Sequence, residues 1–360
     1  MHNDEEVVLS MRRNVVALLC ALTLLLTTVS GVVFAQASNE LVVYSTIFAG
    51  YAEAMKREFE ARNPGVTVHV INPGGTEAML ARLMAERNNP RADVMHSGGS
   101  TEYAFAKAQG LLAPVELGDI GIPEKLPLGD SFLPTRDEEG YYYSWAVLFS
   151  GIMVNTDRMQ RLGLPMPTSY ADLADPIYKG HIISPNPLRS STAVTNVLAV
   201  HQAYDREAAW ELWDKINDNI GFYVDSTSNT YTLVARGEYP IAIVVNRPVY
   251  ELQAQGWPVE FIIPSDGTMV QDNAMGMVNG ARNPELAKKF IEFILSEEMQ
   301  RIGAEFLYSP IRPGVLPDDS FVSLENLKDD IQTLLLPDPE LAEELRPEIQ
   351  AKFESYIRRR

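Results

Sequence analysis

The stretch Leu41-Val-Val-Tyr-Ser45 is a short, continuous apolar run, which is typical of a strand buried on both faces of a sheet. Residues 51–62 follow with apolar side chains at helical spacing and end at Asn-Pro-Gly. Residues 66–71 are strand-like again, Thr76 can cap a second helix, and residues 92–95 form a third strand pattern. The apolar stripe expected on the second helix consists of Met79, Leu80, Leu83 and Met84. This order of elements predicts a parallel α/β sheet.

The second half of the chain repeats this alternation. Residues 150–155, 181–184 and 241–245 are apolar and strand-like, and helical segments separate them. Two such units are typical of a hinged receptor, which holds a ligand between its lobes at the carboxyl ends of the strands. We place the crossings between the lobes near residues 145–150 and 264–274, so that both ends of the chain build the first lobe.

The length of 360 residues also favours two lobes, since domains usually contain about 100–200 residues. We expect a signal peptide at residues 1–37, the first part of lobe 1 at 38–146 and lobe 2 at 147–266. Residues 267–360 should return to lobe 1 and add acidic C-terminal helices from about residue 324 to 358.

The composition excludes several classes of protein. A formal net charge of −18 makes nucleic-acid binding unfavourable, because affinity for the phosphate backbone depends on Lys and Arg. A single cysteine excludes a disulfide scaffold and a cysteine-based zinc site. The five histidines include no His-Glu-x-x-His, so a zinc hydrolase has no visible basis.

The N-terminus has the pattern of an export signal. Arg12 and Arg13 precede an apolar run at residues 15–26, and Ala35-Gln36-Ala37 offers a cleavage site. A permanent membrane anchor is the alternative, although the run is shorter than the roughly 20 residues that a span needs. Lipidation at Cys20 is the second alternative, but Leu19 before it is large. Because residues 1–10 are acidic, we hypothesise that Met11 is the true initiator.

Three segments rich in small and hydroxyl-bearing residues each precede or open a predicted helix: residues 97–101, 190–192 and 226–230. Backbone N–H groups at helix N-termini favour anions, so together these segments predict an anion-binding cleft. Arg189 and Arg247 lie near them and could supply a bidentate fork. Ordinary helix capping and surface salt bridges are the alternative interpretations.

Several stretches resemble family 1 extracellular solute-binding proteins of ABC importers, more narrowly their ferric-binding branch. They are LVVYSTIFAGYAEAMKREFEARNPGVTVHV, GGTEAMLARLMAERNNPRADVMHSGGS, SPNPLRSSTAVTNVLAV, ARGEYPIAIVVN and NPELAKKFIEFILSEEMQ. The likeness extends over about residues 40–308. That branch includes receptors for hexose phosphates, aminoethylphosphonate and thiamine. The resemblance implies an α/β, two-lobed periplasmic-binding-protein fold of type II with a two-segment hinge.

The positions that correspond to the ferric ligands of this branch lack suitable side chains. The usual tyrosine pair falls on Val245-Asn246-Arg247-Pro248, with Tyr250 alone nearby, the usual histidine falls near Ile47-Phe48, and the usual glutamate falls on Gly98 or Gly99. Tyr141-Tyr142-Tyr143 could supply a non-standard set, although aromatic runs near a crossing more often pack the hinge. The anion-holding loops of the branch fall on residues 190–192 and near Thr227-Ser228.

The resemblance and the residues together predict the substrate-binding component of an ABC import system. It would be a monomer in the periplasm that captures a small anionic solute, most simply a phosphorylated or phosphonate compound, and delivers it to a membrane permease. It would need no metal and no cofactor. The predicted ligand-binding residues are Thr46, Ser97, Gly98, Gly99, Ser190, Ser191, Thr192, Thr227, Ser228, Asn229, Arg247 and Asp272.

Alternatives remain open at this point. The protein could be a ferric receptor with an unusual ligand set, or a secreted hydrolase for which His96-Ser97 is the only hint. Asp272 could meet an amine or sugar hydroxyls, or it could be a solvated hinge residue. Four aromatic residues could stack on a ligand ring, although packing is the commoner role: Tyr44, Tyr103, Trp145 and Phe149.

Overall fold

The computed structural model describes residues 39–359 except 129–130, 317–319, 321 and 325–330. The expected signal peptide at residues 1–37, including its cleavage site and Met11, lies outside the described residues. Within the described part, no helix is long and apolar enough to cross a membrane.

A long mixed sheet carries the fold, with neighbouring strands in the order β2-β1-β3-β12-β7-β10-β8-β9. At one end of the sheet, β2, β1 and β3 are parallel, and we call this part the first lobe. At the other end, β10, β8 and β9 are parallel, and we call this part the second lobe. The strands are β1 (Glu40–Ser45), β2 (Thr67–Ile71), β3 (Val94–His96), β4 (Leu112–Ala113), β7 (Tyr143–Asn155), β8 (Ile182–Pro185), β9 (Ile220–Val224), β10 (Ile241–Val245), β11 (Val259–Ile262), β12 (Thr268–Val278), β13 (Ser309–Pro310) and β14 (Leu334–Leu335), with β5 (Lys125–Leu128) and β6 (Ser131–Pro134) as a separate antiparallel pair.

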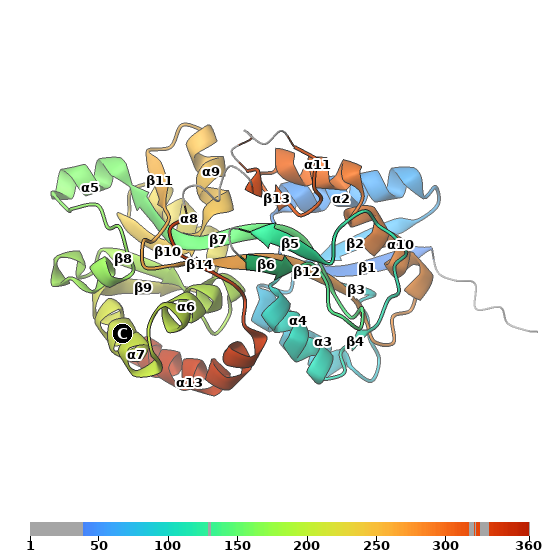
Figure 1. Cartoon of the computed structure of the whole chain (residues 1–360), viewed down its shortest axis with the longest axis horizontal. Helices are drawn as coiled ribbons and strands as arrows, with labels where there is room; N and C mark the ends of the chain where they lie inside the picture. The colour runs from blue at the N-terminus through green and yellow to red at the C-terminus, as the bar shows by residue number, and fades with distance from the viewer. Residues whose placement is uncertain (1–38, 129–130, 317–319, 321, 325–330, 360) are drawn as a thin grey trace, which may run out of the picture. The chain divides into compact units, whose positions relative to one another are not determined.

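Helices cover both faces of the sheet in each lobe (Figure 1). The first lobe carries α2 (Ala49–Arg62), α3 (Thr76–Glu86), α4 (Ser100–Ala108), α10 (Pro284–Ile294) and α11 (Glu297–Glu305). The second lobe carries α5 (Thr156–Leu162), α6 (Ser191–Ala203), α7 (Arg206–Asn219), α8 (Thr227–Ala235), α9 (Asn246–Ala254), two short 3₁₀ turns, η1 (Ala171–Ala174) and η2 (Pro176–Tyr178), and α13 (Pro339–Arg358). Segments from the two ends of the chain lie together in the first lobe, where β12 pairs antiparallel with β3.

Two long strands connect the lobes. β7 pairs with β12 on one side and with β10 on the other, so one continuous strand belongs to both. Both long strands lie where the sequence places the crossings. The residue boundaries given above for the lobes remain a proposal.

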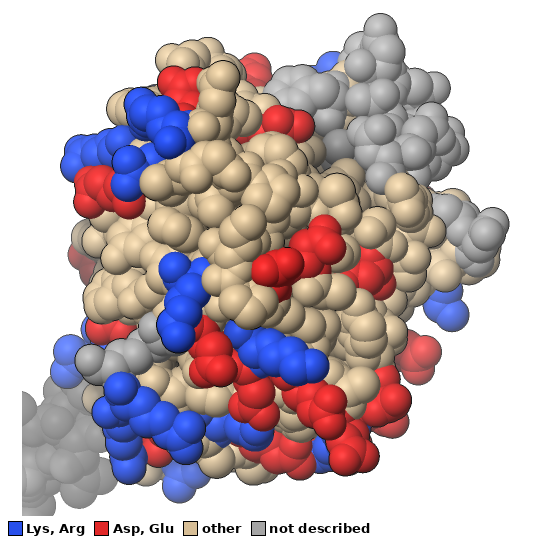
Figure 2. All heavy atoms as spheres, turned by 90° about the vertical axis from the view of Figure 1, so that its left-hand side faces the viewer, with Lys and Arg blue, Asp and Glu red and all other residues tan. Residues whose placement is uncertain are grey.

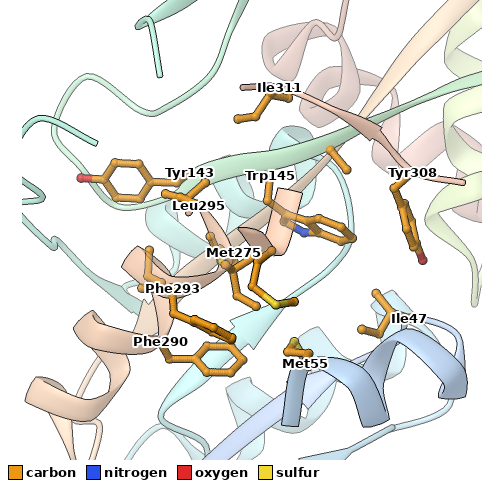
Figure 3. Close-up of a cluster of buried hydrophobic side chains, with 14 of the residues drawn as sticks. Ile47, Met55, Tyr143, Trp145, Met275, Phe290, Phe293, Leu295, Tyr308 and Ile311 are labelled. Atoms are coloured by element: carbon orange, nitrogen blue, oxygen red, sulfur yellow. The ribbon is translucent and has the colours of Figure 1, made fainter. Parts of the chain in front are cut away.

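The interior is aromatic where the first lobe meets β7. Tyr51, Trp145 and Tyr308 pack with ring centroids 4.8–5.3 Å apart, and Trp145 is only 1% exposed. Figure 3 shows Trp145 between Met275 and Tyr308, with Phe290 and Phe293 to the lower left. This packing gives Trp145 a structural role in the first lobe.

Three expectations about local structure are wrong in detail. Met84 is 39% exposed, so the buried stripe of α3 does not include it. Gly75, not Thr76, is the N-cap of α3. Of the acidic helices expected from about residue 324 to 358, α13 begins only at Pro339, because residues 331–338 hold β14 and irregular backbone, while residues 325–330 lie outside the described residues.

Acidic and basic groups lie intermingled over the lower part of the face shown in Figure 2. Such mixing lets neighbouring opposite charges offset one another, which moderates the local effect of a formal net charge of −18.

Candidate solute-binding site

A cavity of about 300 Å³ lies between the two lobes. Its walls come from the loops that follow β1, β2 and β3 in the first lobe and β8, β9 and β10 in the second. Ligands of open parallel sheets bind at the carboxyl ends of the strands, because helix N-termini and loops gather there. The cavity has the position that this rule predicts.

Three helix N-termini open into the cavity. Gly74, Gly75 and Thr76 line it at the start of α3. The other two contributions are Ser190, Ser191 and Thr192 at the start of α6, and Ser226, Thr227 and Ser228 at the start of α8. Free backbone N–H groups and the positive end of each helix dipole favour an anion at such a place.

The lobes touch directly across this cavity. Thr76 Oγ1 lies 3.1 Å from Ser191 Oγ, which joins α3 of the first lobe to α6 of the second. Gly75 has φ +130°, and a Cβ atom placed on it would lie 2.3 Å from the carbonyl oxygen of Arg189. The structure is therefore a closed form, in which a glycine is required at position 75.

Hydroxyl groups on the first-lobe side hold one another in place. Ser97 Oγ lies 2.7 Å from Thr46 Oγ1 and accepts a hydrogen bond from the Thr46 backbone N–H at 2.9 Å. Ser97 has φ +74°, a left-handed conformation that is uncommon for a residue with a side chain. This conformation lets one residue end β3 and present its hydroxyl to the cavity.

One ion pair lies at the edge of the cavity. Arg189 Nε is 3.4 Å from Asp225 Oδ1, and both side chains are more than half exposed. Both residues line the cavity. Exposure allows Arg189 to exchange the carboxylate of Asp225 for an oxyanion of a solute at little cost.

Eight of the twelve residues that the sequence predicts lie together in this cavity. They are Thr46, Ser97, Gly98, Ser190, Ser191, Thr192, Thr227 and Ser228. The other four, Gly99, Asn229, Arg247 and Asp272, are not among the lining residues.

Arg247 makes a contact between the lobes instead of facing the cavity. Its guanidinium stacks over the rings of Phe48 and Tyr308 at 4.2 and 4.9 Å. Its Nε donates to the Phe306 carbonyl at 2.6 Å, and Nη1 pairs with Glu251 at 2.8 Å. The Arg247 side chain is only 1% exposed. Its positive charge is offset by these partners within the protein and is not available to a solute.

Asp272 is also turned away from the cavity. Its carboxylate accepts hydrogen bonds from the Ser100 backbone N–H and hydroxyl at 3.0 and 2.9 Å and from Ser144 Oγ at 2.6 Å. Gly99 donates its N–H to Glu102 Oε2 as the N-cap of α4, and Asn229 is an exposed residue of α8 that does not line the cavity. These contacts give Asp272 and Gly99 structural roles at the start of α4.

Sequence reasoning missed other residues that line the cavity. Gln271 and Asn273 flank Asp272 on β12, and strand alternation would have placed them on the opposite face from it. The predicted residues also do not include Gly74 and Gly75 before α3, although a glycine pair next to a helix start can mark a close approach. Tyr308, which directly precedes β13, is brought to the cavity by tertiary packing and has no local signal.

The aromatic and histidine candidates lie elsewhere. The Tyr143 hydroxyl donates a hydrogen bond to the Val115 carbonyl at 2.5 Å. The ring of Tyr141 makes a cation–π contact with Lys107 Nζ. None of residues 141–143 lines the cavity, nor do Tyr44, Tyr103, Trp145 and Phe149. His96 faces Ser45 in the core at 3.0 Å, and burial lowers the pKa of His96 to about 3. Within the described residues, no group of three or more His, Cys, Asp or Glu side chains is placed to hold a metal ion.

A carboxyl pair next to the site is sensitive to pH. Burial, and then the charge of Glu77, raises the pKa of Glu102 to about 7. Burial also raises the pKa of Glu77, despite Arg346 of α13 at 3.4 Å. Arg346 comes from a helix packed on the second lobe and stacks on Phe105 of the first lobe at 4.4 Å. This charge cluster therefore connects the two lobes.

We expect the protein to lose stability as pH rises from about 4.5 to 7, because folded Glu102 keeps a proton that the unfolded chain has released. The contribution is fully present below the unfolded pKa and is lost as pH rises through the folded pKa. Glu102→Gln should remove this loss, which is about 3 kcal/mol. Urea unfolding at acidic and mildly alkaline pH measures it, with the exposed Glu53→Gln as control. An unchanged pH profile in Glu102→Gln would show that Glu102 ionises normally.

The fold and the cavity define a two-lobed binding protein that closes over a small molecule, and the comparisons with known proteins agree. The profile of the family described as bacterial extracellular solute-binding protein matches residues 89–328. The chain therefore belongs to that family, whose members bind substrates for ABC importers.

Three relatives illustrate the range of the family. The structure of the periplasmic binding protein AfuA from Actinobacillus pleuropneumoniae, with fructose-6-phosphate bound, is 26% identical with a TM-score of 0.79, covering 89% of this chain and 98% of that one. Iron uptake protein A1 of Synechocystis is 27% identical over 84% of each chain. A putative 2-aminoethylphosphonate-binding periplasmic protein of Salmonella typhimurium is 25% identical over 71% of this chain and 72% of the relative.

Proposed function

We propose that this protein is exported to the periplasm, where it captures a small anionic solute between its lobes as a monomer and delivers it to an ABC permease. The solute carries a phosphate, phosphonate or carboxylate group. The observation that carries the proposal is the meeting of three helix N-termini, those of α3, α6 and α8, at one cavity. Each supplies N–H donors and a positive dipole end to the same space.

The side chains around these N-termini fit an oxyanion. Thr227 Oγ1 donates to Ser190 Oγ at 2.7 Å, and so leaves the Ser190 hydroxyl free to turn its own proton toward the cavity. Arg189 is the cationic side chain that lines the cavity, and it can move because it is 59% exposed. Two of the relatives are described with solutes of this chemistry, fructose-6-phosphate and 2-aminoethylphosphonate.

Ferric iron is the weaker candidate. Fe³⁺ prefers several anionic oxygen ligands, and Asp225 is the one carboxylate among the described residues that line the cavity. It is paired with Arg189. The two tyrosines of the lining, Tyr231 and Tyr308, have a pKa raised by burial, which disfavours the phenolate form that iron requires.

Ser228→Asp tests the charge of the solute. Ser228 lines the cavity on the first turn of α8, so a carboxylate there should lower the affinity for an anion at least tenfold by repulsion. Isothermal titration calorimetry with inorganic phosphate, 2-aminoethylphosphonate and fructose 6-phosphate measures this loss.

Asn229→Asp is the matched control. It adds the same charge on the same helical turn, but Asn229 does not line the cavity, so its effect should stay within about threefold. If Ser228→Asp left anion affinity unchanged, or if Fe³⁺ bound with a visible charge-transfer band while the anions did not, the proposal would be wrong.

A further inference from the structure

Two buried amide side chains line the solute cavity without a hydrogen-bond partner among the described residues. Gln271 and Asn273 are each 5% exposed, and both are lining residues. Neither Gln271 Oε1 nor Asn273 Nδ2 has a partner. Native proteins keep few buried polar groups unpaired, because desolvation without a new hydrogen bond is unfavourable. Two such groups in one cavity indicate that a ligand supplies the missing partners.

The strand geometry explains why these two side chains act together. Gln271 and Asn273 are two residues apart on β12, so they lie on the same face of the strand. Asp272 lies between them on the opposite face, where Ser100 and Ser144 satisfy it. The amides thus belong to the wall made by the strand that links the lobes, whereas the helix N-termini of α6 and α8 come from the second lobe.

The chemistry of this wall differs from that of the helix N-termini. A side-chain amide is neutral and carries both a donor and an acceptor, which matches a hydroxyl group. An ammonium group has donors only and would need acceptors, preferably anionic. Asp225, the one lining carboxylate among the described residues, is already paired with Arg189 at 3.4 Å.

We propose that Gln271 and Asn273 form a neutral subsite that binds hydroxyl groups of the solute. The solute class is then a small polyhydroxylated anion and not an aminated one. This inference rests on the proposed function, because it assumes that the anionic end of the same solute occupies the helix N-termini.

Three ligands that carry the same phosphate group distinguish a subsite for hydroxyl groups from a subsite for an amine. Propyl phosphate, glycerol 3-phosphate and 3-aminopropyl phosphate have the same chain length and differ in hydroxyl and amino groups. In calorimetric titrations, glycerol 3-phosphate should bind at least tenfold more tightly than either of the others, because it alone pairs with both amides.

Two variants test whether the amides of Gln271 and Asn273 cause the tighter binding of glycerol 3-phosphate. Gln271→Met and Asn273→Leu keep most of the side-chain volume and remove the polar groups. Each should weaken glycerol 3-phosphate binding about five- to tenfold and change propyl phosphate binding less than twofold. The urea midpoint of each variant should stay the same or rise, because the free protein loses an unpaired buried group.

The outcomes are distinguishable. Equal affinity for the three phosphates, or tightest binding of 3-aminopropyl phosphate, would overturn the inference and leave anion capture intact. Variants that lose stability but keep the wild-type preference among ligands would show that the amides are structural, which also overturns it. If none of the three phosphates binds although fructose 6-phosphate or 2-aminoethylphosphonate does, only the inference fails. If those two ligands do not bind either, the proposed function fails and the inference fails with it.

Discussion

Replacement of Gly75 by alanine is expected to lower solute affinity at least tenfold, since the new methyl group would lie 2.3 Å from the Arg189 carbonyl oxygen in the closed form. The obstacle is backbone from the opposite lobe, so a side-chain rotation cannot remove it. Relief requires the lobes to separate at the point where Thr76 and Ser191 meet. Titration with fructose 6-phosphate and 2-aminoethylphosphonate measures the loss.

Gly74→Ala is the control for backbone strain. Gly74 also has a positive φ, +100°, but a Cβ atom there would have nothing within 4 Å. Both variants should therefore lose a similar amount of stability, while Gly74→Ala keeps most of the affinity. Wild-type affinity in Gly75→Ala would mean that solute binding does not need the closed contact between these loops.

Phe353→Ala should destabilise the protein by about 3–5 kcal/mol. Phe353 is fully buried on α13 and packs edge-on against Trp213, Tyr223 and Tyr356, with ring centroids 5.7, 5.8 and 5.2 Å away. Its truncation leaves a cavity where the C-terminal helix joins the core of the second lobe. Urea unfolding, followed by circular dichroism, measures the change.

Phe222→Ala provides the comparison, because Phe222 of β9 is 52% exposed and its truncation should cost less than about 1 kcal/mol. Equal, small effects in the two variants would show that α13 does not unfold together with the second lobe. A large effect of Phe353→Ala alone would show that residues 339–358 are part of the cooperative unit.

The strands and helices near the cavity could largely be predicted from sequence. Runs such as residues 41–45 and 241–245 are apolar throughout because both faces of their strands are covered by helices, and the structure confirms both as strands. Local signals were weaker at the C-terminus, where β14 lies in the short apolar run of residues 334–336 and α13 begins only after Asp338. A short apolar run is compatible with a strand and with a helix, so the local pattern did not distinguish the two there.

The candidate site was only partly visible in the sequence. Hydroxyl-rich loops at helix starts, such as residues 190–192 and 227–228, reach the cavity because strand ends and helix starts meet at one edge of the sheet. Arg247 shows the limit of this reasoning. It follows a buried strand and carries the expected charge, but α9 turns it between two aromatic rings of the other lobe.

The sequence by itself determined the α/β class, the crossing strands and the family to which the chain belongs, because these depend on local hydrophobic patterns and on motifs that are contiguous in the chain. Only the tertiary structure decided which polar groups face the solute. Asp272 and its neighbours Gln271 and Asn273 differ little in sequence context, yet the first is satisfied by Ser100 and Ser144 while the other two face the cavity unpaired. That division depends on partners more than 120 residues away in the chain, and long-range packing places them.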